Sequence, residues 1–283
     1  MPFVIIASPR TGSSHLVTTL GGHPDIFCNG NIFKRKTLPL FWPRSELGRA
    51  KKQELMKLRR ADPEAFLKTI LDHTFGKPIA GFKIFEGQQN DILSKVIADT
   101  SFRKLILIRK NALANYSSRL LAKQTHEYSV AANRQPSAKA DQPEERPKVA
   151  FEAEEFARFH EKFVAYYRGV MDELRARRQD YYVIGYDDIN EPRLLSAVLG
   201  FVGADTRKTP EVESQFRQLT KQGPSSIVSR FQNKEAVLEF LTRNNLLHWA
   251  HEGSTYLDKL DIPDAGGEPG AASIPSSDLA LAG

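Results

Sequence analysis

Short apolar runs alternate along the chain with longer segments in which apolar residues recur at helical spacing. This alternation is typical of an α/β fold whose strands lie mostly parallel in one central sheet. Runs that are apolar at nearly every position predict strands that are covered on both faces. The strands predicted in this way are residues 3–7, 79–85, 104–108 and 181–186.

The segments between these runs follow the period of an amphipathic helix. They predict helices at residues 13–20, 51–60, 63–75, 91–98, 112–123, 153–178, 193–202 and 234–243. Strands alternating with helices give a three-layer α/β sandwich, in which helices flank a central sheet. We therefore predict one domain over residues 1–262.

Two segments break the pattern. Residues 131–150 hold Pro136, Pro143 and Pro147 among Ala, Gln, Lys and Glu, without any apolar period. Because helix-forming sequence resumes directly afterwards, this stretch predicts a mobile insertion within the domain. Residues 263–283 are rich in Gly, Pro, Ser and Ala, and predict a disordered tail.

Composition narrows the environment and the partners. A single cysteine, Cys28, excludes a disulfide framework within the chain and a cysteine-based zinc cluster. The first residues show no charged leader before the apolar run, so a cytoplasmic protein is predicted. No apolar run of about 18 residues exists, which predicts no membrane span.

The spacing of the histidines suggests no metal site, and the absence of zinc-finger or interleaved basic and aromatic patterns argues against nucleic acid. The net charge of +6 fits an anionic partner.

The most informative residues follow the first predicted strand, where residues 8–14 lead into a helix. A strand, a tight turn and a helix N-terminus form an anion site, because free backbone N–H groups and the helix dipole converge there. Relative to the ATP-binding loop G-x-x-x-x-G-K-[ST], Gly12 and Ser14 match, while Ser13 replaces the Lys. Arg10 supplies a cation two residues before Gly12. The loop predicts a P-loop-type sandwich that binds a phosphate group other than a triphosphate.

This loop resembles the 5′-phosphosulfate loop of sulfotransferases that use 3′-phosphoadenosine 5′-phosphosulfate (PAPS). The resemblance implies a PAPS-dependent enzyme that transfers a sulfonate group to a hydroxyl of a glycan, lipid or small molecule, without a metal. It implies that Arg10 neutralises charge on the departing phosphate. The residues implied to bind the 5′ end are Arg10, Thr11, Gly12, Ser13 and Ser14.

The same family has a strand that ends in Arg, followed by a helix with Ser eight residues later. Arg109 and Ser117 match this spacing and are implied to bind the 3′-phosphate. Ser118 is adjacent and would substitute if the register shifted. Residues 23–30, 81–85, 107–111 and 186–189 are further similar to the bacterial nodulation-factor type of sulfotransferase. The likeness covers roughly residues 3–123 and 181–245, and it leaves out the insertion and the tail.

The chain departs from this pattern at the catalytic base, which must accept the proton of the acceptor hydroxyl. In the nodulation-factor group a Glu usually follows the Asn-Gly pair, but here Asn31 follows Asn29 and Gly30. Because an amide cannot act as a base, either another residue supplies the base or the activity is weak or absent. The candidates are Glu86, which follows a predicted strand, and then His15 and His23.

Three basic residues remain open at this stage. Lys83 in a buried strand requires either an anionic ligand or a cross-strand carboxylate. Lys221 and Arg230 lie in a segment that closes over the nucleotide in many sulfotransferases. Two other functions also remain open: a P-loop kinase of a small molecule, and a non-catalytic nucleotide-binding module on the same fold.

Overall fold

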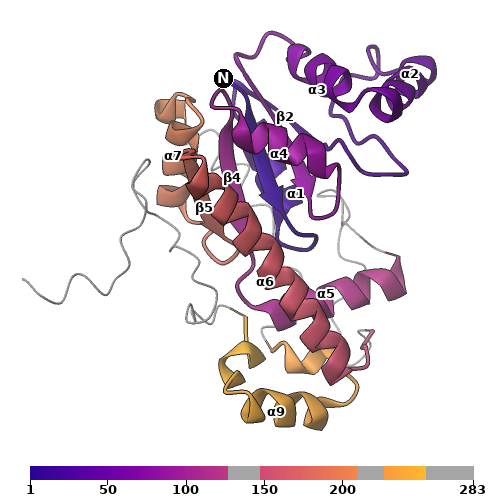
Figure 1. Ribbon diagram of the computed structural model, residues 1–283, viewed down its shortest axis with the longest axis vertical. Helices are drawn as coiled ribbons and strands as arrows, with labels where there is room; N and C mark the ends of the chain where they lie inside the picture. The colour runs from indigo at the N-terminus through magenta and orange to yellow at the C-terminus, as the bar shows by residue number, and fades with distance from the viewer. Residues whose placement is uncertain (127–146, 209–225, 253–283) are drawn as a thin grey trace, which may run out of the picture.

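The computed structural model describes residues 1–126, 147–208 and 226–252, and its centre is one sheet of five parallel strands (Figure 1). The strand order is β2–β3–β1–β4–β5. The strands are β1 (Phe3–Ala7), β2 (Ile26–Asn31), β3 (Ile79–Phe85), β4 (Arg103–Ile108) and β5 (Tyr181–Gly185). Every neighbouring pair is parallel, so the predicted α/β sandwich with a parallel central sheet is confirmed.

Helices follow the strands and cover both faces of the sheet. Every predicted helix is present, with shifts of one to three residues at some ends. The helices are α1 (Ser13–Gly21), α2 (Arg49–Ala61), α3 (Pro63–Asp72), α4 (Asn90–Ala98), α5 (Ala112–Thr125), α6 (Ala153–Ala176), α7 (Pro192–Phe201) and α9 (Lys234–Arg243). Three short 3₁₀ helices lie at Thr206–Lys208, Val228–Arg230 and Leu247–Ala250.

Local sequence explains where these helices begin and end. The Asp62 carboxylate caps α3 by accepting hydrogen bonds from the backbone N–H groups of Glu64 and Ala65. Pro63 occupies the first helical turn, where its missing N–H costs nothing. The helix ends at Asp72, three residues earlier than predicted, because His73 leaves helical geometry with a ψ of 81°.

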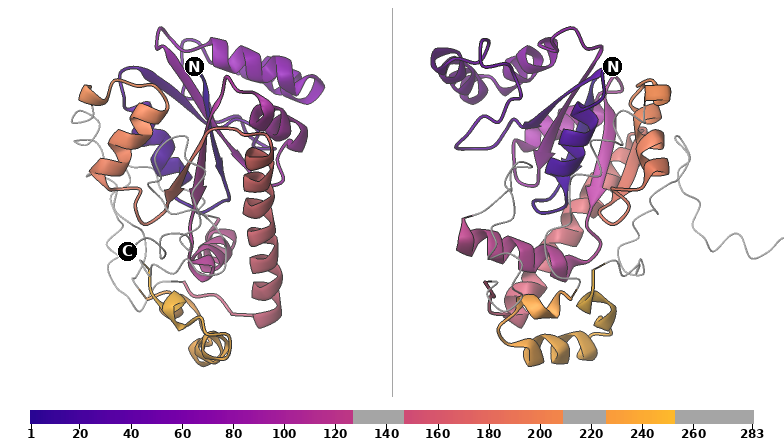
Figure 2. Two further views of the ribbon diagram at one scale, coloured as in Figure 1. Left: turned by 60° about the vertical axis from the view of Figure 1, so that its left-hand side comes forward. Right: turned by 180° about the vertical axis from the view of Figure 1, so that it is seen from behind.

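The apolar core forms two layers, one on each face of the sheet. On one face, β1 packs against α1 and α7; on the other, the sheet packs against α3, α4, α5 and α6. Figure 2 (left) shows α6 on one side of the strands and α1 and α7 on the other. All five residues of β1 are fully buried. This explains why β1 lacks the alternation of a half-exposed strand.

The sequence analysis did not predict the edge strand β2, and this omission is wrong. Its six residues contain only three apolar positions before Asn29, Gly30 and Asn31, a composition typical of a turn. Pairing with β3 nevertheless holds it extended, with an irregularity in register between Cys28 and Asn31. Tertiary pairing here overrides local preference.

Several predictions fall on residues outside the described ranges. These are most of the insertion at 131–150, the tail at 263–283, and Lys221. Within residues 147–150, Val149 is buried and forms a parallel bridge with Phe231. The insertion at about 131–150 stays a prediction. Among the described residues, no helix is both long and apolar enough to cross a bilayer. The assignment of residues 1–262 to one domain stays a prediction.

Candidate active site

The candidate site lies at the edge of the sheet where all five parallel strands end. The loop 8–14 leaves β1 there, Glu86 follows β3, Arg109 follows β4, and Tyr186 follows β5. Since β1 pairs with both β3 and β4, the loop lies between the ends of those two strands. Carboxyl ends of parallel strands are where ligands of such sheets bind.

Two residues of the loop 8–14 have a positive φ, a backbone conformation that residues other than glycine rarely adopt. Gly12 caps α1 at a φ of 80°, and Arg10 also has a positive φ of 69°. A Cβ at Gly12 would lie 3.0 Å from the ring of Tyr186, so both conformation and space favour glycine. The Thr11 hydroxyl donates a 2.7 Å hydrogen bond to the Ser8 carbonyl. Together these features direct the loop into the N-terminus of α1.

Tyr167 on α6 ties the loop to β4. Its side chain is fully buried, and its hydroxyl accepts a hydrogen bond of 2.8 Å from the Ser8 N–H. The same hydroxyl donates to the Leu107 carbonyl, also at 2.8 Å. The backbone at the start of the loop is thereby fixed relative to the strand that carries Arg109.

Replacing Tyr167 by Phe is expected to destabilise the fold by about 2–4 kcal/mol. The change leaves the Ser8 N–H and the Leu107 carbonyl buried without their partner, and each such loss costs about 1–3 kcal/mol. The neighbouring Tyr166 provides a matched control, because its buried hydroxyl has no hydrogen-bond partner among the described residues. Tyr166→Phe should therefore change stability little. Urea unfolding of both variants measures the difference, and equal losses would contradict this role of Tyr167.

Lys83 on β3 reaches the loop from the face of the sheet that α1 covers. Its ammonium group donates to the hydroxyls of Ser13, at 3.2 Å, and Ser14, at 2.9 Å. Neither alternative considered for Lys83 includes these hydroxyl partners. Burial lowers the pKa of Lys83 to about 8. A cation therefore lies against the two serines of the loop, although the loop lacks the Lys of ATP-binding loops.

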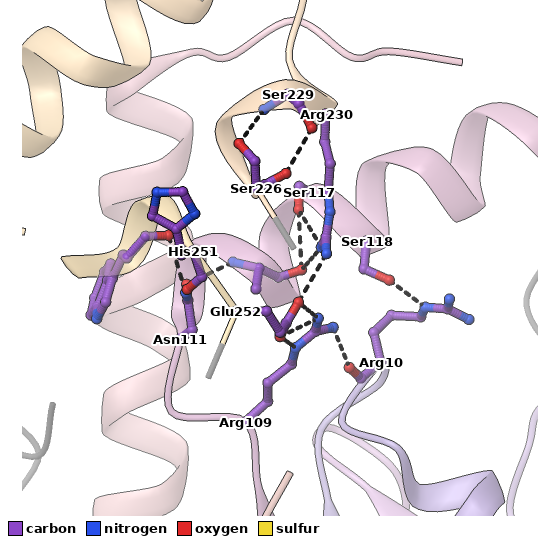
Figure 3. Close-up of polar contacts among 12 residues, drawn as sticks. Arg10, Arg109, Asn111, Ser117, Ser118, Ser226, Ser229, Arg230, His251 and Glu252 are labelled. Carbon is purple, nitrogen blue, oxygen red and sulfur yellow. Dashed lines mark hydrogen bonds and ion pairs between the residues drawn. The ribbon is translucent and has the colours of Figure 1, made fainter. Parts of the chain in front are cut away.

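Figure 3 shows a second cluster, next to the loop, in which two arginines meet one carboxylate. Arg109 donates to both carboxylate oxygens of Glu252, with contacts of 2.6, 2.6 and 2.9 Å. Arg230 donates to the same carboxylate at 2.9 Å. The Ser117 hydroxyl lies 3.4 Å from the Arg230 guanidinium. The predicted pair Arg109 and Ser117 is thus brought together, with Arg230 as a third member.

Arg10 connects the loop to this cluster. Its carbonyl accepts a 3.2 Å hydrogen bond from Arg109, and its guanidinium donates to the Ser118 hydroxyl at 2.9 Å. Burial, and then the positive charge of Arg109, lower the pKa of Arg10. Ser118 therefore contacts the loop arginine, while Ser117 faces Arg230.

The three candidate bases lie in different places. Glu86 directly follows β3, and its N–H donates to the Ala7 carbonyl at 3.3 Å. Burial raises the pKa of its carboxylate, while the charge of Arg119 acts in the opposite direction. His15 on α1 contacts the Asn190 side chain at 2.7 Å, and burial lowers its pKa.

His23 does not reach this edge of the sheet. It precedes β2, so it lies at the amino ends of the strands, a strand length of roughly 20 Å from the loop. Its ring is fully buried between the Asp25 N–H and the Asp205 carbonyl, each at 3.1 Å. The structure therefore brings Glu86 and His15 to the loop but separates His23 from it.

Asn31 ends β2 level with Lys83 of β3. Its side chain is buried, and the side-chain amide oxygen has no hydrogen-bond partner among the described residues. Cys28, three residues earlier, is buried, and burial raises its pKa to about 12. Its thiol is therefore unreactive near neutral pH.

Sequence reasoning missed Glu252 and left the role of Arg230 open. Nothing in the sequence around residue 252 marks a binding site, because the contact joins segments that are 143 residues apart. In the described ranges, no group of three or more His, Cys, Asp or Glu side chains could hold a metal ion.

Comparison with known proteins finds relatives that are similar in sequence. Nodulation protein H of Rhizobium tropici is 28% identical over 232 residues, which cover 78% of this chain and 82% of that protein. Nodulation protein H of Rhizobium meliloti (strain 1021) is 28% identical over 130 residues, 45% of this chain and 49% of that protein. No family model matches the chain.

Two solved structures are also similar. A sulfotransferase from Alicyclobacillus acidocaldarius is 18% identical with a TM-score of 0.45, covering 88% of this chain and 98% of that one. The sulfotransferase domain of the Synechococcus PCC 7002 olefin synthase is 14% identical with a TM-score of 0.37, covering 84% and 94%.

These relatives and solved structures are what the chain is similar to in sequence and in fold. The chain is thus similar to nodulation protein H over most of its length, which confirms the resemblance to the nodulation-factor type found in the sequence.

Proposed function

We propose that the chain transfers a sulfonate group from PAPS to a hydroxyl acceptor, with the loop 8–14 binding the 5′ end of the donor. The backbone N–H groups at the start of α1 and the hydroxyls of Ser13 and Ser14 suit the oxygens of a phosphate or sulfonate. Lys83 and Arg10 supply positive charge from two sides. The acceptor is a glycan, lipid or small molecule.

The observation that carries this proposal is a second anion site beside the loop. Arg109 and Arg230 converge on one carboxylate next to Ser117, and β4, which positions Arg109, is the strand paired with β1. A donor with one phosphate at each of two positions on its ribose requires two such sites. ATP, whose phosphates form a single chain, does not.

In the proposed reaction the acceptor oxygen forms a bond to sulfur, and the bond between sulfur and the bridging oxygen of the 5′-phosphate breaks. The electron pair of that bond leaves with adenosine 3′,5′-bisphosphate. Arg10 and Lys83 are proposed to neutralise the charge that develops on the leaving oxygen. Glu86 accepts the proton of the acceptor hydroxyl, since burial raises its pKa and so makes it a better base.

The chain has a single cysteine, Cys28, which is buried and has no second cysteine within the chain to pair with. We expect an enzyme of the cytoplasm, where thiols stay reduced and disulfides are rare.

Binding measurements test the donor. Adenosine 3′,5′-bisphosphate is expected to bind at least tenfold more tightly than ATP, and without magnesium, because only the bisphosphate offers an anion to each site. Isothermal titration calorimetry with both ligands, with and without magnesium, measures the two affinities. Equal affinities, or a requirement for magnesium, would instead favour a small-molecule kinase.

A further inference from the structure

The carboxylate of Glu252 lies where the proposed function requires a phosphate. It accepts hydrogen bonds from Arg109 and Arg230, and its side chain is only 12% exposed. The two arginine side chains are 5% and 6% exposed. Figure 3 shows the carboxylate between the two guanidinium groups, beside the turn of α5 that carries Ser117.

The positive charges of this cluster outnumber its negative charges. Arg109 and Arg230 bring two positive charges to a single carboxylate, and Arg10 lies close enough for the charge of Arg109 to lower its pKa. Glu252 contributes one negative charge and two acceptor oxygens. A phosphate monoester carries about 1.5 to 2 negative charges and three acceptor oxygens at pH 7. A phosphate therefore matches the cluster better than the carboxylate does.

The chain is anchored immediately before Glu252. The Asn111 side-chain amide donates to the carbonyls of Trp249, at 3.1 Å, and His251, at 3.0 Å. The Ile227 N–H donates to the Ala250 carbonyl at 2.7 Å. Because these bonds hold the preceding residues, we expect the side chain of Glu252, and not the backbone before it, to move when the carboxylate leaves the arginines.

We propose that Glu252 is an internal competitor of the donor, whose carboxylate occupies the 3′-phosphate position and must be displaced when the nucleotide binds. The inference rests on the proposed function. Burial alone would raise the pKa of Glu252, but Arg109 and Arg230 lower it below its ordinary value. The carboxylate is therefore ionised at neutral pH, where it competes with a phosphate for the two arginines. Donor affinity therefore depends on how much more strongly the two arginines bind the 3′-phosphate than they bind the Glu252 carboxylate.

Two ligands that differ only in the 3′-phosphate test the inference: adenosine 3′,5′-bisphosphate and adenosine 5′-monophosphate. Glu252→Gln is expected to bind the bisphosphate at least tenfold more tightly than the unaltered chain does, because the neutral amide is a weaker competitor for the arginines. Affinity for the monophosphate should stay unchanged. Glu239→Gln, which removes an exposed carboxylate paired with Arg243, is the matched control and should alter neither affinity.

The outcomes separate the inference from the function on which it rests. If the bisphosphate binds better than the monophosphate but Glu252→Gln weakens it or leaves it unchanged, Glu252 only orders the arginines and the competition is refuted. If no form of the chain prefers the bisphosphate, the proposed 3′-phosphate site itself fails.

A second measurement guards against loss of folding in the variant. Thermal unfolding with inorganic phosphate should raise the Tm of Glu252→Gln more than that of the unaltered chain, since phosphate replaces the missing anion. An equal rise in both proteins would count against the competition.

Discussion

Replacing Glu86 by Gln is expected to lower turnover by about 10²–10⁴-fold, which is the usual contribution of a positioned general base. The amide keeps the size of the side chain but cannot accept the proton of the acceptor hydroxyl. Affinity for adenosine 3′,5′-bisphosphate should stay nearly constant, because the carboxylate is proposed to face the acceptor. Transfer of radiolabelled sulfonate from PAPS to a panel of glycans, lipids and phenols measures turnover, and calorimetry measures affinity.

Substitutions at His15 and Asn31 complete this experiment. Loss of turnover in His15→Ala, with Glu86→Gln fully active, would identify the imidazole as the base. Asn31→Glu restores the residue usual in the nodulation-factor group, and should cause little loss or raise turnover. Should all three changes be silent and no acceptor be sulfonated, the chain would be a nucleotide-binding protein on a sulfotransferase scaffold.

Replacing Arg109 by Ala is expected to weaken binding of adenosine 3′,5′-bisphosphate by roughly ten- to a hundredfold, since a hydrogen bond to a charged group contributes about 1.5–3 kcal/mol. The expected effect on acceptor affinity is much smaller. The adjacent Lys110→Ala is the control, and it should matter less because Arg109 is the residue at the end of β4 that meets Arg230 and Ser117 around Glu252. A larger loss from Lys110→Ala would show that the assigned register is incorrect.

The two predictions also report on different regions of the candidate site. Glu86→Gln should lower kcat with the affinity for the nucleotide intact, while Arg109→Ala should act first on that affinity. If Arg109→Ala lowered kcat alone, the second anion site would not bind the donor in the ground state.

Most of the fold could be predicted from the sequence, because most residues of its strands are buried. The apolar runs of β1 and β3 have few other interpretations once helical segments follow them. The edge strand β2 could not be predicted, since half of it is Asn and Gly and only its pairing with β3 holds it extended. Local patterns carry no information about such partners.

The residues of the candidate site likewise fall into those that a local motif predicts and those that depend on tertiary packing. The loop 8–14 and the pair Arg109 and Ser117 were predicted because each lies within one local motif. Glu252 was missed because its contact with Arg109 depends on how the C-terminal segment folds back over α5. Lys83 was singled out as a buried charge, but its partners on α1 follow only from the packing of that helix on the sheet.

The pairing of β1 with β4 has a consequence for how such an enzyme diversifies. One anion site follows β1 and the other follows β4, so the spacing between them depends on two neighbouring strands in the middle of the sheet. Strands in register are about 4.8 Å apart and hardly vary. Surface loops, including the segment between β2 and α2, are therefore able to change length and sequence without altering the distance between the two sites. If the acceptor binds to such loops, as the proposed function allows, acceptor choice and donor choice are encoded in separate parts of the chain, and one can evolve while the other stays fixed.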